Sequence, residues 1–176
     1  MGMEQIAAAM ERVASVLRRK PQAGRHEDTA ATARWDGGLR TSVYSDTGHA
    51  VATDMPVDMG GDAGAETPGW LLRAALASCA VTRIAMAAAA QGITLAKLEA
   101  RATSRSDLRG LLDVAEPDGR AVPAGPLAMD LHVCIGAPGI SAERLRALVA
   151  STAACSPVTC AVEQPLPVTV HVEVTP

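Results

Sequence analysis

The order of the predicted elements indicates an α+β protein built around antiparallel strands. The chain reads as a helix, a group of short strands, a long apolar helix, two more strands, a helix pair and a final strand. Strands that follow one another, instead of alternating singly with helices, are typical of an antiparallel sheet. With 176 residues, the chain is long enough for one domain with a substantial core. We expect an N-terminal amphipathic helix over 1–20 and a single α+β domain over 21–176.

In the first part of the chain, the spacing of the apolar residues changes from that of a helix to that of a strand. Apolar residues recur at helical spacing from Met3 to Leu17 and predict an amphipathic helix over 3–19, which ends before Pro21. From Thr29 to Ala52 the pattern shortens and predicts a meander of two or three strands. The Gly- and Pro-containing residues 54–66 predict a loop.

The strongest single pattern is the long helix that follows this loop. Thr67 is a good N-cap, and Pro68 fits the first helical position, where its missing N–H costs nothing. Apolar residues then occupy all sides through Ala90, and Gly92 supplies a stop. A helix that is apolar on all sides is buried, normally in the core of a protein. A domain of this size has difficulty enclosing such a helix alone, so we expect a homodimer.

Two further strands are predicted over 95–105 and 127–135, joined by a turn-rich loop over 113–126. In the second strand the apolar residues share one face, whereas Asp130, His132 and Cys134 share the other. This alternation predicts a half-buried sheet.

The last third of the chain carries two helix starts and one strand pattern. Ser141 can cap a helix, and Ser156-Pro157 repeats the N-cap and first-position signature for a short helix to about Gln164. From Val168 to Val174, valine alternates with polar residues, which predicts a final half-buried strand.

Composition excludes several classes of function. The net charge of −3 and the pI of about 5.8 give no support for binding nucleic acid or an anionic membrane surface. Two Trp, one Tyr and no Phe provide few surfaces for base stacking. The apolar stretch 70–90 is interrupted by Arg73 and Arg83, so we expect a buried helix and no membrane span. Without a secretory signal, the four cysteines predict a cytoplasmic protein with reduced thiols.

The cysteines are the residues with the most evident chemistry. Cys79 lies in the middle of the long helix, and Arg83 follows one turn later, where its charge favours a thiolate. Taken alone, a cysteine in this setting is more often a small packing residue. Cys155 precedes the short helix and Cys160 lies inside it, a spacing that is not a zinc pattern. We therefore expect no metal site, and no motif predicts a cofactor.

Five short motifs follow one another in an order typical of one known family: Gly60-Gly61-Asp62, Thr67-Pro68, Leu71-Leu72-x-Ala74-Ala75-Leu76-Ala77-Ser78-Cys79, Gly92-Ile93 and Ser156-Pro157-Val158-Thr159. On these residues, the chain resembles the OsmC/Ohr family, the osmotically inducible protein C-like and organic hydroperoxide resistance proteins. The resemblance covers roughly residues 29–175. It implies an intertwined homodimer whose antiparallel sheets wrap around two long central helices.

The resemblance also implies a thiol peroxidase reaction. The first cysteine, Cys79 here, attacks an organic hydroperoxide and becomes a sulfenic acid. A second cysteine condenses with it to a disulfide, which an external dithiol reduces. In the family that cysteine directly precedes Pro, whereas here Ser156 holds the position and Cys155 lies one residue earlier. We assign the second thiol to Cys155, with Cys160 as the alternative.

Two other family positions concern activation of the thiol. The activating arginine is Arg40 or Arg34, and the sequence does not choose between them. The glutamate expected just after Pro68 is absent, because Gly69 and Trp70 follow.

Three hypotheses remain. The first is thiol-dependent reduction of organic hydroperoxides in oxidative-stress defence. The second is a non-catalytic dimer that binds a small hydrophobic or thiol-containing ligand. The third is a structural dimer in which Cys79 only packs.

Overall fold

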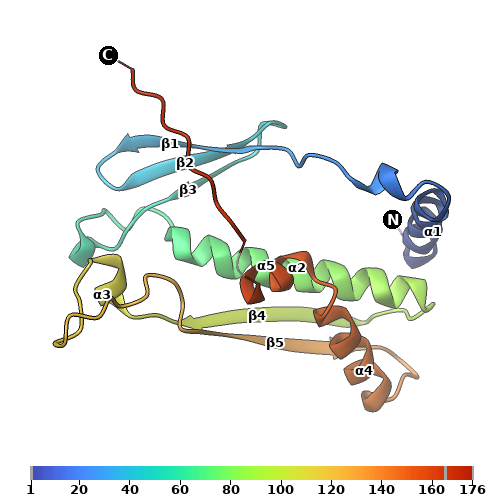
Figure 1. Cartoon of the computed structure of the whole chain (residues 1–176). Coiled ribbons are helices and arrows are strands. Elements are labelled where there is room, and N and C mark those ends of the chain that lie inside the picture. Colours follow the sequence, from blue (N-terminus) through green and yellow to red (C-terminus); the bar gives the residue numbers. More distant parts are fainter. Residues whose placement is uncertain (1, 165, 176) are drawn as a thin grey trace.

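The computed structural model describes residues 2–164 and 166–175; residues 1, 165 and 176 lie outside the described part. Two antiparallel sheets lie on opposite sides of one long helix, α2 (Figure 1). The elements are α1 (Met3–Arg19), η1 (Pro21–Gly24), β1 (Ala31–Gly37), β2 (Arg40–Ser45), β3 (Ala50–Thr53), η2 (Val57–Met59), α2 (Pro68–Ala90), β4 (Lys97–Arg105), α3 (Leu108–Leu111), β5 (Ala128–Gly136), α4 (Ala142–Ala153) and α5 (Pro157–Glu163). The predicted α+β class is confirmed.

The N-terminal sheet is the predicted meander. Strands β1, β2 and β3 pair in chain order and are antiparallel. The turn between β1 and β2 uses Gly37 and Gly38, both with positive φ, and the register shifts just before it, between Trp35 and Gly37. Positive φ is the conformation that glycine adopts without steric cost, so this turn explains the Gly-Gly pair.

A buried carboxylate organises the loop that leads from β3 to α2. Asp54 is only 1% exposed, and its carboxylate accepts hydrogen bonds from the backbone N–H groups of Met55 (2.7 Å), Asp62 (3.3 Å) and Gly64 (3.0 Å). The bonds from Gly64 and Met55 are the main reason that the pKa of Asp54 lies below its ordinary value, and the Arg40 charge lowers it further. A Cβ at Gly61 would fall 2.0 Å from the Met55 carbonyl oxygen, so only glycine fits there.

Helix α2 has the predicted start and end. The Thr67 hydroxyl accepts from the Trp70 N–H at 3.2 Å, and Gly92 ends the helix with a φ of 65°. One stripe is buried: Leu76, Ala80, Ile84, Ala88 and Ala89. Leu72 continues this stripe towards the start of the helix but is 37% exposed, and Trp70, on another face, is 40% exposed. By length and hydropathy alone α2 could also cross a membrane. A single chain thus covers only part of its apolar surface.

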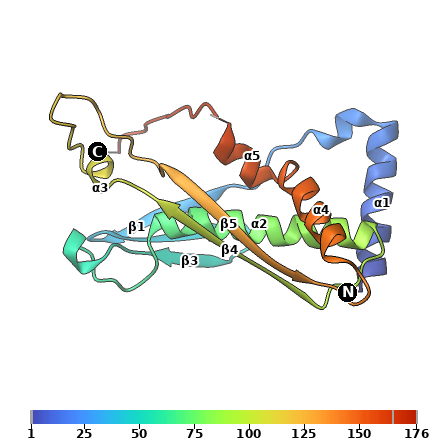
Figure 2. The same ribbon diagram turned by 90° about the horizontal axis from the view of Figure 1, so that it is seen from below.

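The C-terminal sheet supplies most of that cover. Strands β4 and β5 pair from Lys97↔Gly136 to Arg105↔Ala128, and β4 packs on α2. Viewed from below, both strands run across α2, with α4 and α5 alongside (Figure 2). The core cluster joins Ile84 and Ala88 of α2 to Ile93 and to Leu148 of α4. Met3 of α1 packs against the same cluster, so α1 covers the far end of α2.

Two segments differ from expectation. The predicted strand at 168–174 is wrong for the single chain: residues 166–175 form no strand, and the four valines are 77–85% exposed. The alternation of valine with polar residues suits this segment to strand pairing. A strand also needs a sheet edge with which to pair, and the tertiary structure decides whether the segment reaches one. The short helix α3 has no counterpart among the predicted elements. Asp107 caps it, and Arg109 pairs with Asp107 and Glu116.

We predict that Asp54→Asn destabilises the fold in a pH-dependent way. A carboxyl whose pKa is lowered in the folded state contributes stability above the ordinary carboxyl range, and that contribution is lost as pH falls through the folded pKa. Urea unfolding should therefore show a clear loss of stability at pH 7 that shrinks towards about pH 3. Asp58→Asn, at an exposed carboxylate of the same loop, is the control. Equal loss at both pH values would contradict the role of the Asp54 charge.

Candidate functional site

The candidate site lies where the middle of α2 meets the turn before α5. Cys79 is partly buried on α2, and the Ser156 hydroxyl donates a hydrogen bond to its Sγ at 3.3 Å. Ser156 is itself 1% exposed. A hydroxyl that donates to sulfur stabilises negative charge on that sulfur. The structure therefore gives Cys79 a buried polar partner, which an inert packing cysteine does not need.

The backbone of Ser156 occupies the predicted N-cap position before Pro157. Its side chain makes no capping hydrogen bond, unlike Ser141 at the start of α4, whose Oγ accepts from the Arg144 N–H at 3.3 Å. The hydroxyl is directed to Cys79 instead. Sequence reasoning missed this contact because Ser-Pro is equally typical of an ordinary helix start. The available signal was that Ser156 occupies the family's second-cysteine position.

Arg83 brings positive charge to the same place. It lies one helical turn after Cys79, and its Nε donates to the Cys155 carbonyl oxygen at 3.2 Å. Its Nη1 lies 3.9 Å from the Met86 sulfur. The guanidinium thus links α2 to the turn that carries Ser156, and it places a cation beside the Cys79–Ser156 pair.

The other cysteines have different surroundings. All four cysteines are free thiols; Cys155 is exposed, and Cys160 is partly buried. The Cys160 thiol donates to the Ala154 carbonyl oxygen at 3.6 Å. Cys134 is exposed on the outer face of β5, as the strand pattern predicts. Within the described residues, no group of three His, Cys, Asp or Glu side chains could hold a metal ion.

The two candidate arginines lie on the N-terminal sheet. Arg40 Nη1 is close to Gly64, where an added Cβ would come within 2.7 Å of it, and its charge acts on Asp54. This loop leads into the start of α2, whereas Cys79 lies eleven residues beyond Pro68, roughly 16 Å along the helix. Arg34 lies over the Tyr44 ring, 5.3 Å from its centroid. Arg40 therefore lies beside the loop that leads into the helix carrying the thiol.

An apolar pocket of about 760 Å³ lies along α2 before Cys79, and Cys79, Arg83 and Ser156 are not among the residues that line it. Residues from α2, β5, α4 and α5 line it, among them Leu72, Leu76, Leu127, Met129, Leu131, Val149 and Val162. Leu72 and Leu76 precede Cys79 on α2 by seven and three residues, so they lie on neighbouring turns of the same helix. The pocket is large enough for a small organic molecule.

Comparison with known proteins identifies a family and a fold. The sequence profile of the OsmC-like protein family matches residues 60–171, more than half of the chain. Among solved structures, the chain is similar to an organic hydroperoxide resistance protein OsmC from Legionella pneumophila, with 23% identity, 78% and 90% of the two chains covered, and a TM-score of 0.57. An OsmC-like protein from Mycoplasma pneumoniae shares 20% identity over 81% and 90%, with a TM-score of 0.61.

A third structure is the organic hydroperoxide resistance protein OhrB of Bacillus subtilis, with 20% identity, 79% and 93% coverage, and a TM-score of 0.52. At these identities the solved structures show the shared fold. No curated protein matches the chain.

We predict that Ser156→Ala slows the reaction of Cys79 with iodoacetamide by about tenfold or more near neutral pH. The reason is that one hydrogen bond to a charged group contributes about 1.5 kcal/mol or more. Peptide mass spectrometry gives the alkylation rate at Cys79 alone. Ser78→Ala is the matched control, because the neighbouring Ser78 hydroxyl donates to the Ala75 carbonyl and not to sulfur. Unchanged rates in both variants would show that the Ser156 contact does not activate the thiol.

Proposed function

Because the chain belongs to the OsmC-like protein family, we propose that it reduces organic hydroperoxides at Cys79. The observation that carries the proposal is the hydrogen bond from the buried Ser156 hydroxyl to the Cys79 sulfur. Two of the structurally similar proteins are organic hydroperoxide resistance proteins, which supports the choice of substrate class.

The first half of the reaction needs only the groups at this site. The Cys79 thiolate attacks the outer peroxide oxygen, an S–O bond forms and the O–O bond breaks. The sulfur is oxidised to sulfenic acid, and the alkoxide leaves and takes up a proton as the alcohol. Ser156 stabilises the anion before attack, and the Arg83 guanidinium stabilises negative charge near the sulfur.

The apolar pocket favours an organic substrate over hydrogen peroxide. Its lining is dominated by Leu, Val, Met and Ala side chains, with Glu163 as the charged member. An alkyl or aryl hydroperoxide can place its apolar part there, and the burial of that part supplies binding energy. The same pocket is the feature that supports the second hypothesis, binding of a small hydrophobic ligand without turnover.

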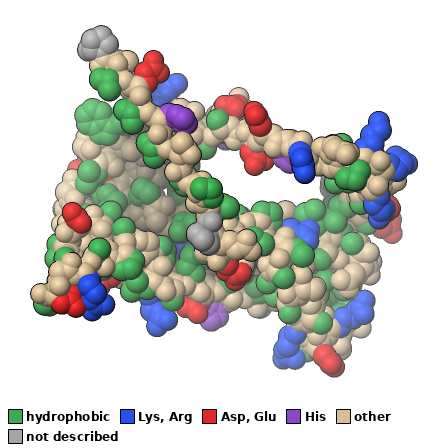
Figure 3. Space-filling view, viewed as in Figure 1, with side chains coloured by type: hydrophobic (Ala, Val, Ile, Leu, Met, Phe, Trp, Pro, Cys, Tyr) green, Lys and Arg blue, Asp and Glu red, His purple; other side chains and the backbone are tan. Residues whose placement is uncertain are grey.

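We further propose that the active form is a homodimer. A partner subunit would bury two sets of exposed apolar residues, those of α2 and the valines of the C-terminal segment. It could also fill the opening beside α2 (Figure 3). The segment that joins α1 to β1 borders this opening. If two α2 helices pack antiparallel, the start of one lies beside the later part of the other. Arg40 of one subunit, which lies beside the loop before α2, can then approach Cys79 of its partner.

The second half of the reaction returns the sulfenic acid to the thiol. The sequence assigns the second thiol to Cys155, or to Cys160 as the alternative, and the electrons to an external dithiol. These assignments stay predictions. The glutamate that the family places after Pro68 has no counterpart on the first turn of α2, where Gly69 and Trp70 stand.

We predict that cumene hydroperoxide removes titratable thiol from the reduced protein and that Cys79→Ser abolishes the consumption of the hydroperoxide. Thiol titration together with an assay of residual hydroperoxide gives both values. Cys134→Ser, at an exposed thiol on the outer face of β5, should leave the consumption unchanged. An unaltered thiol count in the wild type, or unchanged consumption by Cys79→Ser, would reject catalysis. Binding of an apolar ligand in the pocket would then be the hypothesis to test.

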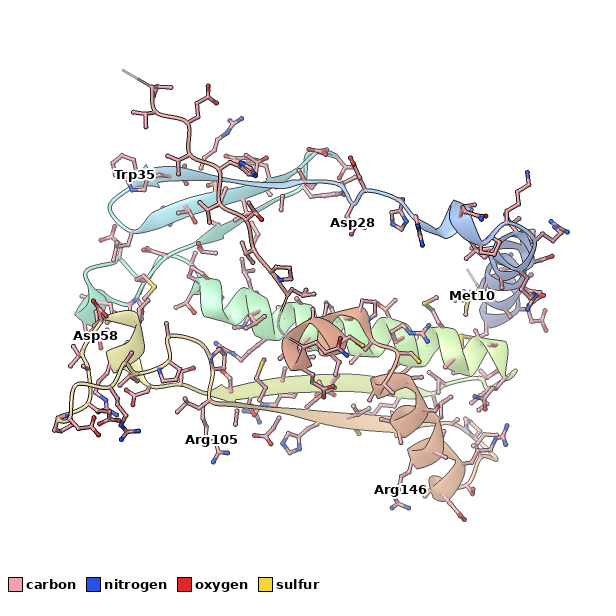
Figure 4. All side chains as sticks on the ribbon, viewed as in Figure 1. Met10, Asp28, Trp35, Asp58, Arg105 and Arg146 are labelled. Carbon is pink, nitrogen blue, oxygen red and sulfur yellow. The ribbon has the colours of Figure 1, made fainter. Side chains whose placement is uncertain are left out.

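We predict that the wild-type protein is a dimer in solution and that Trp70→Asp shifts it towards the monomer. The change places a charge on the exposed apolar side of α2, where a partner would have to desolvate it. Multi-angle light scattering measures the molar mass, and circular dichroism checks that the variant is folded. Arg146→Glu, which changes a side chain on the outer face of α4, is the control (Figure 4). A monomeric wild-type protein would contradict the proposal.

A further inference from the structure

We propose that oxidised Cys79 is resolved by an external small monothiol and not by a second cysteine of this chain. The inference rests on the proposed function, because it concerns the sulfenic acid which that reaction forms. It is carried by the positions of three side chains around the turn before α5.

Ser156 occupies the position from which a resolving thiol would reach Cys79. Its Oγ lies 3.3 Å from the Cys79 Sγ and is buried at the contact between α2 and the turn. A hydroxyl cannot form a disulfide. It can hold the sulfenic acid by a hydrogen bond, which prolongs the lifetime of that species. The nearest side chain from this turn is thus a stabilising group and not a resolving one.

Cys155 is directed elsewhere. The backbone of Ser156 is extended, with φ −85° and ψ 118°, and adjacent side chains of extended backbone point to opposite sides. In agreement with this geometry, Ser156 is buried and Cys155 is exposed. The turn is held in place, because Arg83 Nε binds the Cys155 carbonyl oxygen at 3.2 Å and the Cys155 N–H donates to the Thr152 carbonyl at 3.1 Å.

The thiol of Cys160 also has a hydrogen-bond partner near it in the chain. It lies on the first turn of α5, and its thiol donates to the carbonyl oxygen of Ala154, on the chain that precedes the helix. A disulfide requires a sulfur–sulfur distance of about 2.05 Å. To reach Cys79, Cys160 would give up its hydrogen bond to Ala154, and Cys155 would leave the exposed side of a turn that hydrogen bonds hold in place. A small thiol needs no such rearrangement, because Cys79 is only partly buried.

The proposed resolution balances with two equivalents of monothiol. The first thiol attacks the sulfur of the Cys79 sulfenic acid, a mixed disulfide forms and water leaves. The second thiol, as thiolate, attacks the sulfur of the small molecule in that mixed disulfide. The small-molecule disulfide is released, and the Cys79 thiol is restored after uptake of a proton. The hydroperoxide supplies the oxidising equivalents, and the two thiols supply both electrons.

The test uses the full-length reduced protein, one equivalent of cumene hydroperoxide and intact-mass spectrometry under non-reducing conditions. Without added thiol, we expect the mass to rise by one oxygen, with the oxygen at Cys79 by peptide mapping. With one equivalent of 2-mercaptoethanol as the probe, we expect instead one adduct of this thiol at Cys79, and with an excess of this thiol we expect the mass of the reduced protein. Formation of an internal or inter-subunit disulfide from Cys79 to Cys155 or Cys160 in the wild type would overturn the inference and leave the proposed function standing. No oxidation at Cys79 would overturn the proposed function itself.

Ser156→Cys gives the converse result. A sulfur at position 156 faces Cys79, and a cavity of about 20 Å³ bordered by Ser156 and Arg83 leaves room for the larger atom. We expect this variant to lose two hydrogens on oxidation, to form a disulfide between Cys79 and the introduced thiol, and to take up no 2-mercaptoethanol. Ser156→Ala is the control and should still give the adduct. If Ser156→Cys and the wild type behave alike, the hydroxyl at this position does not decide the route, and the inference fails.

Discussion

The rest of the structure depends on one constraint, a 23-residue helix that is apolar on every side. Such a helix must be covered all round, but the chain that carries it covers only one stripe, with β4, the end of α1 and the α4–α5 pair. Trp70 and Leu72 at the start of α2 and the valines of the C-terminal segment remain exposed in the single chain. This explains why a chain of ordinary size leaves so many large apolar side chains exposed.

The candidate site results from the same arrangement. Because α5 packs against the middle of α2, its preceding turn brings one buried hydroxyl to one partly buried sulfur. Arg83 holds that turn from the α2 side, so two hydrogen bonds join the turn to α2, one at the Cys155 carbonyl and one at the Cys79 sulfur. The apolar residues that α2 needs for packing also line the pocket beside the thiol. Packing and chemistry therefore use the same helix face.

Local patterns predict most of the fold, and non-local contacts account for what they miss. Periodicity and capping residues place α1, α2, the β4–β5 pair and both C-terminal helices, because each of these is determined within a short window. The valine segment has a correct local pattern but no strand partner within the described part of its own chain. The Ser156-Pro157 pattern indicates only a helix cap, because the other partner of Ser156 lies 77 residues away in sequence. The family resemblance identifies Cys79, yet it cannot show that Arg40 lies near the start of α2.

The loop around Asp54 has a consequence for how this protein can vary. Three backbone amides, spread over ten residues, converge on one carboxylate, and at Gly61 the Met55 carbonyl leaves no space for a side chain. An insertion or deletion between Met55 and Gly64 would put the wrong amides opposite the carboxylate. It would also move Arg40 and the first turn of α2 relative to each other. Selection should therefore conserve the length of this loop more strictly than the identity of its exposed residues.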